Sequence, residues 1–313
     1  MNFMSLDYFI MVARERSFTK AAARLHVTQQ TLSTHIATLE KEIGSTLLVR
    51  HVPLELTYAG EVFYRYAVDI QRKLHSMQQE MDDIAKKEKG RLRVGIAHTR
   101  GHAIMPPILN AYLETHPMVQ VQLVEASNAV LQNKLQNGDL DLAIANFPDK
   151  LPGITLEDFY QEEIVLLLPD TLLHTLYGEE KESILAELKD TGDLSRLGDC
   201  PFLMGNEADI AGRIGRMLLQ KWDVIPQIKS ESDNIETLLE CCVRDMGACF
   251  CPENLVRTTL SEVAVEHLHV IHFAEGTRYM IRFGSMKQSY EWSMLSKFIA
   301  CAKEIMGRNT VFA

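Results

Sequence analysis

The stretch SFTKAAARLHVTQQTLSTHIATLE, residues 17–40, decides how the first part of the chain folds. Ser17 and Thr28 are each placed to cap a helix, because a hydroxyl that precedes a helix accepts a hydrogen bond from an unpaired backbone N–H. The run of alanines after Lys20 is small enough to let another helix approach closely. The stretch therefore predicts two helices joined by a tight turn at His26 and Val27.

The second of these helices has two faces of different character. Its apolar side chains recur at the spacing of one helix face, and they are Leu32, Ile36, Leu39 and Ile43. The opposite face carries the polar residues Gln29, Gln30, Ser33 and Thr34. No Lys or Arg lies between Thr28 and Leu39, and the nearby cations flank the helix as Arg14, Arg16, Lys20, Arg24, Lys41 and Arg50.

This polar face has the chemistry of a helix that reads DNA. In a helix-turn-helix the second helix enters the major groove, where glutamine binds adenine through two hydrogen bonds and Ser or Thr binds several base edges. Flanking cations suit phosphate contacts, which position a protein on DNA without reading its sequence. A plain three-helix bundle with a solvated polar face is the alternative that the pattern leaves open.

A further helix and a wing complete the pattern. The apolar side chains Leu6, Phe9, Ile10 and Ala13 form one face of a first helix, with Ser5 as its expected cap. Residues 17–50, followed by Leu-Thr-Tyr-Ala-Gly at 56–60, resemble the winged helix-turn-helix of the LysR-type transcriptional regulators. The resemblance is carried without a gap by Ala21, Ala22, Leu25, Val27, Gln29, Ser33, Leu39, Glu40, Gly44, Leu47, Leu48, Arg50, Leu56, Thr57, Ala59 and Gly60.

The resemblance implies a sequence-specific DNA-binding regulator that is not an enzyme and needs no cofactor. The DNA-binding residues that it implies are Thr28, Gln29, Gln30, Thr31, Ser33, Thr34, Lys20 and Arg50. The family usually has Ser-Gln-Pro where this chain has Thr28 to Gln30, a cation where it has Thr34, and an Arg-rich wing where it has residues 51–55. Fewer cations predict a shallower dependence of DNA binding on salt, and they leave open which bases are read.

A long helix is expected to follow the wing, with Thr57 as its cap. Its apolar residues alternate in steps of four and three, as Phe63, Ala67, Ile70, Leu74, Met77, Met81 and Ile84. Such a heptad pattern is typical of two helices that form a coiled coil, so Phe63, Ile70, Leu74, Met77 and Met81 are predicted to mediate dimerisation. The alternative is a single amphipathic helix packed on its own body. The family resemblance favours a tetramer of the chain.

From Arg91 onward the pattern alternates between strands and helices. Strands near 92–96, 119–123 and 141–145 with helices from about His102 to Thr115 and from Asn128 to Asn137 predict a βαβαβ unit with a parallel sheet. A second series has strands at 164–168, 202–204, 227–231 and 248–251, and helices at 209–222 and 234–244. The segments 278–284 and 290–306 have no partner in this second series and are expected to return to the first lobe. Residues 171–200 have no interpretation.

Two such lobes match the periplasmic-binding-protein design and resemble the LysR-type effector domain. The predicted fold class is α/β with an all-α N-terminal part: a winged helix-turn-helix at 1–60, a linker and dimerisation helix at 57–89, and a two-lobed, type 2 effector domain at 91–313. Lobe I is expected at about 91–162 and 270–313, and lobe II at about 163–269.

Ligands of open α/β folds bind beyond the carboxyl ends of the strands, where helix N-termini point inward. Hydroxyls, amides and one cation at these places predict a small, anionic effector such as a carboxylate in an interlobe cleft. The predicted effector-binding residues are Thr99, Arg100, Ser127, Asn128, Asn146, Gly205, Asn206 and Asn234. Each of them could instead be a cap or a loop residue.

Composition narrows the function classes. The first 90 residues carry 12 cations against 11 anions and the rest carry 20 against 31, within a total of 32 and 42, which is compatible with nucleic acid at the head.

No membrane-spanning run or signal pattern occurs, so the cytoplasm is expected. The six cysteines contain no C-x-x-C pair, so no metal site is predicted, and a redox-responsive regulator is the alternative. The motifs of common α/β enzymes are absent, which disfavours an enzyme with a helical extension.

Overall fold

The structure is a computed structural model, and it describes the chain apart from residues 1, 52, 86–88, 288–289 and 309–313. The contacts within the chain divide it into two compact units, each of which is described by itself. Unit 1 consists of Met1–Glu88 with Gln288–Trp292, and unit 2 of Lys89–Lys287 with Ser293–Ala313. Among the described residues no helix is long and apolar enough to cross a membrane.

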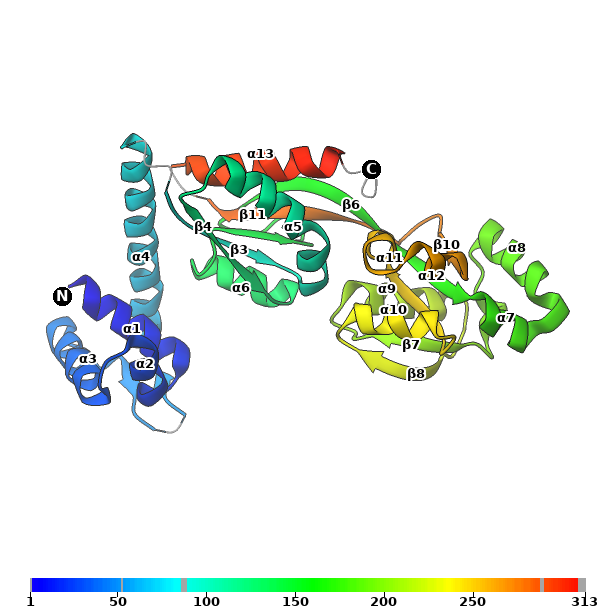
Figure 1. Cartoon of the computed structure of the whole chain (residues 1–313). Helices are drawn as coiled ribbons and strands as arrows, with labels where there is room; N and C mark the ends of the chain where they lie inside the picture. Colours follow the sequence, from blue (N-terminus) through cyan, green and yellow to red (C-terminus); the bar gives the residue numbers. More distant parts are fainter. Residues whose placement is uncertain (1, 52, 86–88, 288–289, 309–313) are drawn as a thin grey trace. The chain divides into compact units, whose positions relative to one another are not determined.

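Unit 1 contains three helices, a two-stranded wing and a long helix (Figure 1). These elements are α1 (Phe3–Glu15), α2 (Phe18–Leu25), α3 (Gln29–Ile43), β1 (Leu48–Val49), β2 (Glu55–Leu56) and α4 (Tyr58–Ile84). The strands β1 and β2 pair antiparallel. The predicted winged helix-turn-helix is therefore confirmed, and its wing is short.

Side-chain caps fix where these helices begin. Ser17, Thr28 and Thr57 each accept a hydrogen bond from a backbone N–H of the helix that follows, as predicted. The expected cap of α1 was wrong: Asn2 caps this helix, because its amide oxygen accepts from the backbone N–H of Ser5 at 2.8 Å. The helix α1 consequently begins at Phe3 and not after Ser5.

The core of the head is formed where α1, α2, α3 and the wing meet. Its buried side chains are Phe9, Val12, Ala21, Ala22, Leu32, Ile36, Leu39, Leu47, Leu48 and Leu54. Ile43, which was expected on the inward face of α3, is 39% exposed. It lies in the last turn, where Gly44 ends the helix in the left-handed region at φ +73°.

The long helix α4 divides its apolar residues between two environments. Phe63 packs edge-on against the ring of Phe9, with 5.0 Å between ring centroids, and Ile70 packs on the buried cluster that includes Leu6 and Ile10 of α1. Both side chains are thus partly buried inside unit 1, and their role in dimerisation stays a prediction. The later part of the seam is open: Met77 and Met81 are each 54% exposed.

Lobe I of unit 2 is a sheet covered by helices (Figure 1). Its parallel strands are β3 (Gly90–Ile96), β4 (Val119–Glu125) and β5 (Leu142–Ala145), and β11 (Arg278–Met286) pairs antiparallel with β5. Its helices are α5 (His98–Thr115), α6 (Asn128–Gln136) and α13 (Ser293–Arg308). The helix α13 packs on α5 through Tyr112 and Phe298. The predicted βαβαβ unit and the return of the last strand and helix to lobe I are confirmed, although α5 begins four residues earlier than expected.

Lobe II has a second sheet, built on β6 (Ile154–Pro169). The other strands are β7 (Pro201–Gly205), β8 (Gln227–Ser232), β9 (Ala248–Pro252) and β10 (Leu268–Ile271). The helices α9 (Ile210–Lys221), α10 (Ile235–Val243), α11 (Glu253–Thr259) and α12 (Glu262–Glu266) complete the lobe. Strand β7 runs parallel to both β8 and β9, so these three strands share one carboxyl edge.

The two sheets share the strand β6, which has 16 residues. Its first part pairs with β11, from Ile154 opposite Met286 to Glu163 opposite Arg278. From Ile164 onward it pairs with β9 and β10. Only residues 164–168 were predicted as a strand, so the sequence located the part in lobe II and missed the part in lobe I.

The segment without an interpretation, residues 171–200, is helical. It forms α7 (Asp170–Tyr177), α8 (Lys181–Thr191) and two single turns, η1 (Gly178–Glu180) and η2 (Ser195–Leu197). Its apolar side chains enter the core of lobe II, namely Leu173, Ile184, Leu185, Leu188, Leu194 and Leu197. Asp170 ties the segment to the lobe, since its Oδ1 lies 2.9 Å from Lys181 Nζ and 2.6 Å from His269 Nε2. These two partners lower the pKa of Asp170.

Candidate functional site

The polar face of α3 is open to solvent. Thr28, Gln29, Gln30, Thr31 and Thr34 are exposed, Ser33 is half-buried, and Lys20 of α2 and Arg50 after the wing strand β1 are exposed. A hydrogen bond of 3.2 Å from Thr19 Oγ1 to Gln29 Oε1 links α2 to the start of α3. The structure therefore brings the start of α3 and the start of α2 together.

Several hydroxyls of this face already donate within the helix. Thr34 Oγ1 donates to the carbonyl of Gln30 at 2.9 Å, and Thr38 Oγ1 donates to the carbonyl of Thr34 at 2.9 Å. Each hydroxyl has one proton and two lone pairs, so Thr34 presents acceptor capacity outward. Because the amide oxygen of Gln29 accepts from Thr19, its amide nitrogen is the group left to donate.

The cations around α3 have different surroundings. Arg50 Nη2 lies 3.0 Å from Glu40 Oε2, and its guanidinium lies 5.8 Å from the centre of the Phe18 ring. Glu40 Oε1 also accepts from the backbone N–H of Leu47 at 2.8 Å, so Arg50 is fixed to the base of the wing. The ammonium of Lys20 has no ion-pair partner among the described residues, so it is available for a phosphate.

In unit 2, the predicted effector residues lie at two strand edges. The parallel strands β3, β4 and β5 end at one edge of lobe I, where α5 and α6 begin. Arg100, Ser127, Asn128 and Asn146 lie at this edge, and Gly205, Asn206 and Asn234 lie at the carboxyl edge of β7 and β8. The side chain of Thr99 is outside the described part of the structure.

The first two turns of α5 connect the two edges. His102 Nδ1 lies 3.4 Å from Glu236 Oε1, which belongs to the first turn of α10 in lobe II. Ala103 packs on the buried cluster of lobe II that contains Leu238 and Leu239. The beginning of α5 therefore belongs to both lobes, and groups on this turn can respond to both.

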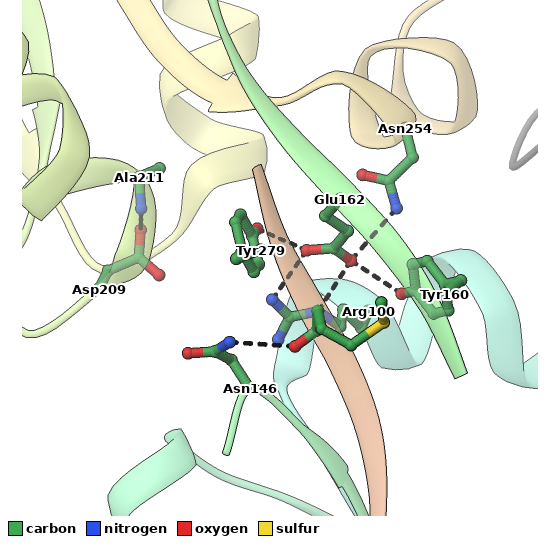
Figure 2. Close-up of polar contacts among 9 residues, drawn as sticks. Arg100, Asn146, Tyr160, Glu162, Asp209, Ala211, Asn254 and Tyr279 are labelled. Atoms are coloured by element: carbon green, nitrogen blue, oxygen red, sulfur yellow. Dashed lines mark hydrogen bonds and ion pairs between the residues drawn. The ribbon is translucent and has the colours of Figure 1, made fainter. Parts of the chain in front are cut away.

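Arg100 is held in a buried ion pair beneath this turn (Figure 2). Its Nε and Nη2 donate to the two carboxylate oxygens of Glu162 at 2.9 Å each, and its side chain is 8% exposed. Tyr160 and Tyr279 also donate to Glu162, and Asn254 of α11 lies 3.4 Å from its Oε1. Glu162 therefore balances the charge of Arg100, and the role of Arg100 in binding an effector stays a prediction.

The pKa values of this cluster reflect burial and pairing. Burial alone would raise the pKa of Glu162, but the charge of Arg100 and the hydrogen bonds from Arg100, Tyr279 and Tyr160 outweigh it and lower the pKa. Burial and the neighbouring Glu162 carboxylate raise the pKa of both tyrosines well above the usual value. The carboxylate is thus ionised and the phenols are protonated at neutral pH.

Most of the other predicted effector residues have local structural partners. Asn146 Nδ2 donates to the carbonyl of Met280 at 3.0 Å, and Asn206 Oδ1 accepts from the N–H of Ala208 at 2.9 Å. Asn234 caps α10. In contrast, Asn128 Oδ1 is buried without a hydrogen-bond partner among the described residues, and Ser127 is exposed and makes no capping bond.

Sequence patterns gave no indication of the groups that complete this region. Glu162 and Tyr279 are 117 residues apart, and the group that they form with Tyr160 and Asn254 follows no motif. Glu236 was inside a predicted helix, yet its proximity to α5 depends on how the lobes meet. These residues could be recognised only with the strand register in hand.

The thiols of lobe II are mostly in its core. Cys200, Cys242, Cys249 and Cys251 are buried, while Cys241 is half-buried. Burial raises the pKa of Cys200 to about 12 and raises the pKa of the other three buried thiols as well. Because the thiolate is the reactive form, these four thiols are poor peroxide sensors.

Comparison with known families identifies both units. Residues 3–61 match the model of the bacterial regulatory helix-turn-helix protein, lysR family. Residues 85–306 match the LysR substrate binding domain. The chain belongs to the LysR family. It is a DNA-binding transcriptional regulator with an effector domain, as the sequence predicted.

Curated relatives of this LysR-type chain are also regulators. The chain is 29% identical over 264 residues to the uncharacterized HTH-type transcriptional regulator YcgK of Bacillus subtilis, which covers 82% of this chain and 81% of the relative. It is 35% identical over 191 residues to the HTH-type transcriptional regulator AlsR of the same organism, at 61% and 62% coverage.

Solved LysR structures have the same fold. A full-length OxyR variant from Pseudomonas aeruginosa gives a TM-score of 0.69 at 21% identity and covers all of both chains. CbnR in complex with its target DNA gives a TM-score of 0.57 at 22% identity, with 97% of this chain and 100% of CbnR covered. At identities of 21% and 22%, the structural similarity establishes the fold alone. It gives no information on the ligand or the oligomeric state of this chain.

Proposed function

We propose that this LysR-type regulator reads double-stranded DNA in the cytoplasm through the exposed polar face of α3, with Lys20 on a phosphate. The observation that supports the proposal is the row of amide and hydroxyl groups on a helix whose other face is buried in the head. Gln29 would donate to a base edge, and Thr34 would accept from a base amino group such as adenine N6 or cytosine N4.

Fluorescence anisotropy with labelled upstream DNA tests this assignment. The double variant Gln29→Ala with Ser33→Ala is expected to weaken specific binding by about 2 kcal/mol or more, since each good base contact contributes about 1–3 kcal/mol. Thr38→Ala, on a later turn of the same helix, is the matched control and should bind as wild type does. Equal affinity of the double variant and the control would show that the recognition face is misassigned.

We further propose that the protein is a homodimer through the open part of α4, and that dimers pair into tetramers. The exposed Met77 and Met81 continue the heptad seam beyond the residues that pack on α1, and burying such a seam favours a coiled coil. Met77→Lys with Met81→Lys should lower the mass measured by light scattering, whereas Gln78→Lys, on the neighbouring face, should not. An unchanged mass for the double variant would exclude this seam.

The effector is proposed to bind where the carboxyl edges of the two lobes meet, around the first turn of α5. Support comes from Asn128, whose buried amide oxygen lacks a partner, and from the contact of His102 with Glu236 across the lobes. A compound that shifts the thermal unfolding of the wild-type protein should lose this shift in Asn128→Ala. The control Asn110→Ala, on the distant part of α5, should keep the shift.

A further inference from the structure

The first turn of α5 presents hydrogen-bond donors that have no side-chain partner among the described residues. Ala97 precedes the helix and has no side chain that could cap it, so the first backbone N–H groups have no side-chain acceptor. Arg100 lies in the same turn, and its Nη1 group has no hydrogen-bond partner in the described part of the chain. Figure 2 shows the guanidinium with Glu162 on one side and Asn146 on another. A helix start joined to a buried guanidinium edge suits a carboxylate.

Two carboxylates flank the same turn. Glu125 Oε2 lies 3.1 Å from His98 Nδ1, and a Cβ atom placed on Gly101 would lie 2.7 Å from Glu125 Oε1. On the side of lobe II, Glu236 reaches His102 at 3.4 Å. The side chains of Glu125 and Glu236 are 35% and 34% exposed, and the two histidines are 83% and 70% exposed. A cationic ligand group could therefore replace either imidazole with little loss of packing.

The surrounding charge is negative. Glu162 cancels the charge of Arg100, and Arg216 is shared between Glu207 and Glu231 at 3.7 and 2.6 Å. Asp209 and Asp233 lie on the same edge of lobe II and are exposed. An effector with only negative charge would meet repulsion here, because like charges in a partly desolvated site cost binding free energy.

We propose that the effector is a zwitterion of the amino-acid type. Its carboxylate binds the first turn of α5 and Arg100 Nη1, and its ammonium binds between Glu125 and Glu236, with the buried oxygen of Asn128 as a further acceptor. This inference rests on the proposed effector site and names the chemical class that the site selects. It replaces the purely anionic effector that the residue types alone suggested.

The test uses the full-length protein and three matched series of compounds. The twenty protein amino acids are screened by thermal shift and calorimetry, and each one that binds is compared with its deaminated carboxylic acid and its decarboxylated amine. Both analogues are expected to bind at least about tenfold more weakly, which corresponds to about 1.4 kcal/mol. Glu236→Gln should weaken binding of the amino acid by about tenfold and leave binding of the deaminated acid unchanged. Glu262→Gln on α12 should change the affinity for neither compound.

The possible results test the zwitterionic class of the effector separately from the proposed location of its site. A deaminated acid that binds as tightly as its amino acid, and loses binding in Asn128→Ala, overturns the zwitterion and supports the location. An amino acid that binds equally well to wild type, Asn128→Ala and Glu236→Gln overturns both the class and the location. Failure of every amino acid to bind overturns the zwitterion.

Discussion

Removal of the buried carboxylate, by Glu162→Gln, should destabilise unit 2 more than any single surface change. The carboxylate accepts two hydrogen bonds from Arg100 and others from Tyr160, Tyr279 and Asn254, and it lies beneath the first turn of α5. Removing one partner of a buried ion pair costs about 3–5 kcal/mol, because the other charge stays buried without compensation. At about 2–4 °C per kcal/mol for a domain of this size, the melting temperature should fall by roughly 6–20 °C.

The chain has a convenient reporter for this measurement. It contains two tryptophans, of which Trp222 lies in lobe II and Trp292 belongs to unit 1. In a Trp292→Phe background, the fluorescence of Trp222 follows the unfolding of lobe II alone. Arg244→Ala, which breaks an exposed pair with Glu240 on α10, is the control and should leave the transition unchanged.

A double-mutant cycle sharpens the prediction. Arg100→Met combined with Glu162→Gln should be more stable than the sum of the single losses, because the double variant leaves no charge buried. The folded-state pKa of Glu162 is lowered, so the stability from this pair is complete above the ordinary glutamate pKa of about 4.3 and is lost as the pH falls through the folded-state value. Glu162→Gln should remove that part of the acid sensitivity. A loss under about 1 kcal/mol for Glu162→Gln, or additive single changes, would refute the role of the pair.

Three further predictions follow from the head and the thiols. Gly60→Ala should lower the melting temperature of unit 1, because the added Cβ would lie 2.0 Å from the carbonyl oxygen of Leu47. Gly307→Ala is the control: its Cβ would meet no atom within 4 Å, so it should not destabilise α13. Asn2→Ala should cost about 1 kcal/mol in chemical unfolding and Ser5→Ala less, and the reverse order would restore Ser5 as the cap. Mild peroxide should leave DNA affinity in anisotropy unchanged, since the core thiols have raised pKa values; a reversible change would reinstate the redox alternative.

Local patterns predicted the helices and most strands, because their signals lie within a few residues. The caps at Ser17, Thr28 and Thr57 were readable for this reason. The cap of α1 was missed because Asn2 and Ser5 are both good capping residues three positions apart, and sequence alone does not choose between them. The first part of β6 was missed because residues 155–163 are largely polar, and its pairing with β11 comes from more than a hundred residues away.

The effector region was predictable only in outline. The rule that ligands meet the carboxyl ends of strands led to residues such as Arg100 and Asn128, which the structure places at the carboxyl edge of lobe I. The buried ion pair of Arg100 was not predictable, because Glu162 approaches through the register of β6 with β11. Residue type alone therefore gave no indication that Glu162 balances the charge of Arg100.

The shared strand β6 also limits how this protein can change in length over evolution. Glu162 and Glu163 are neighbours on opposite faces of the strand: the first is buried with Arg100, and the second pairs with Arg278 at 2.9 Å. A one-residue insertion in the first part of β6 would shift one part of the strand against its partner and turn the side chains of that part to the opposite face. The helical segment at 171–200 has no such constraint. Deletions and insertions should therefore accumulate in that segment and be selected against in β6.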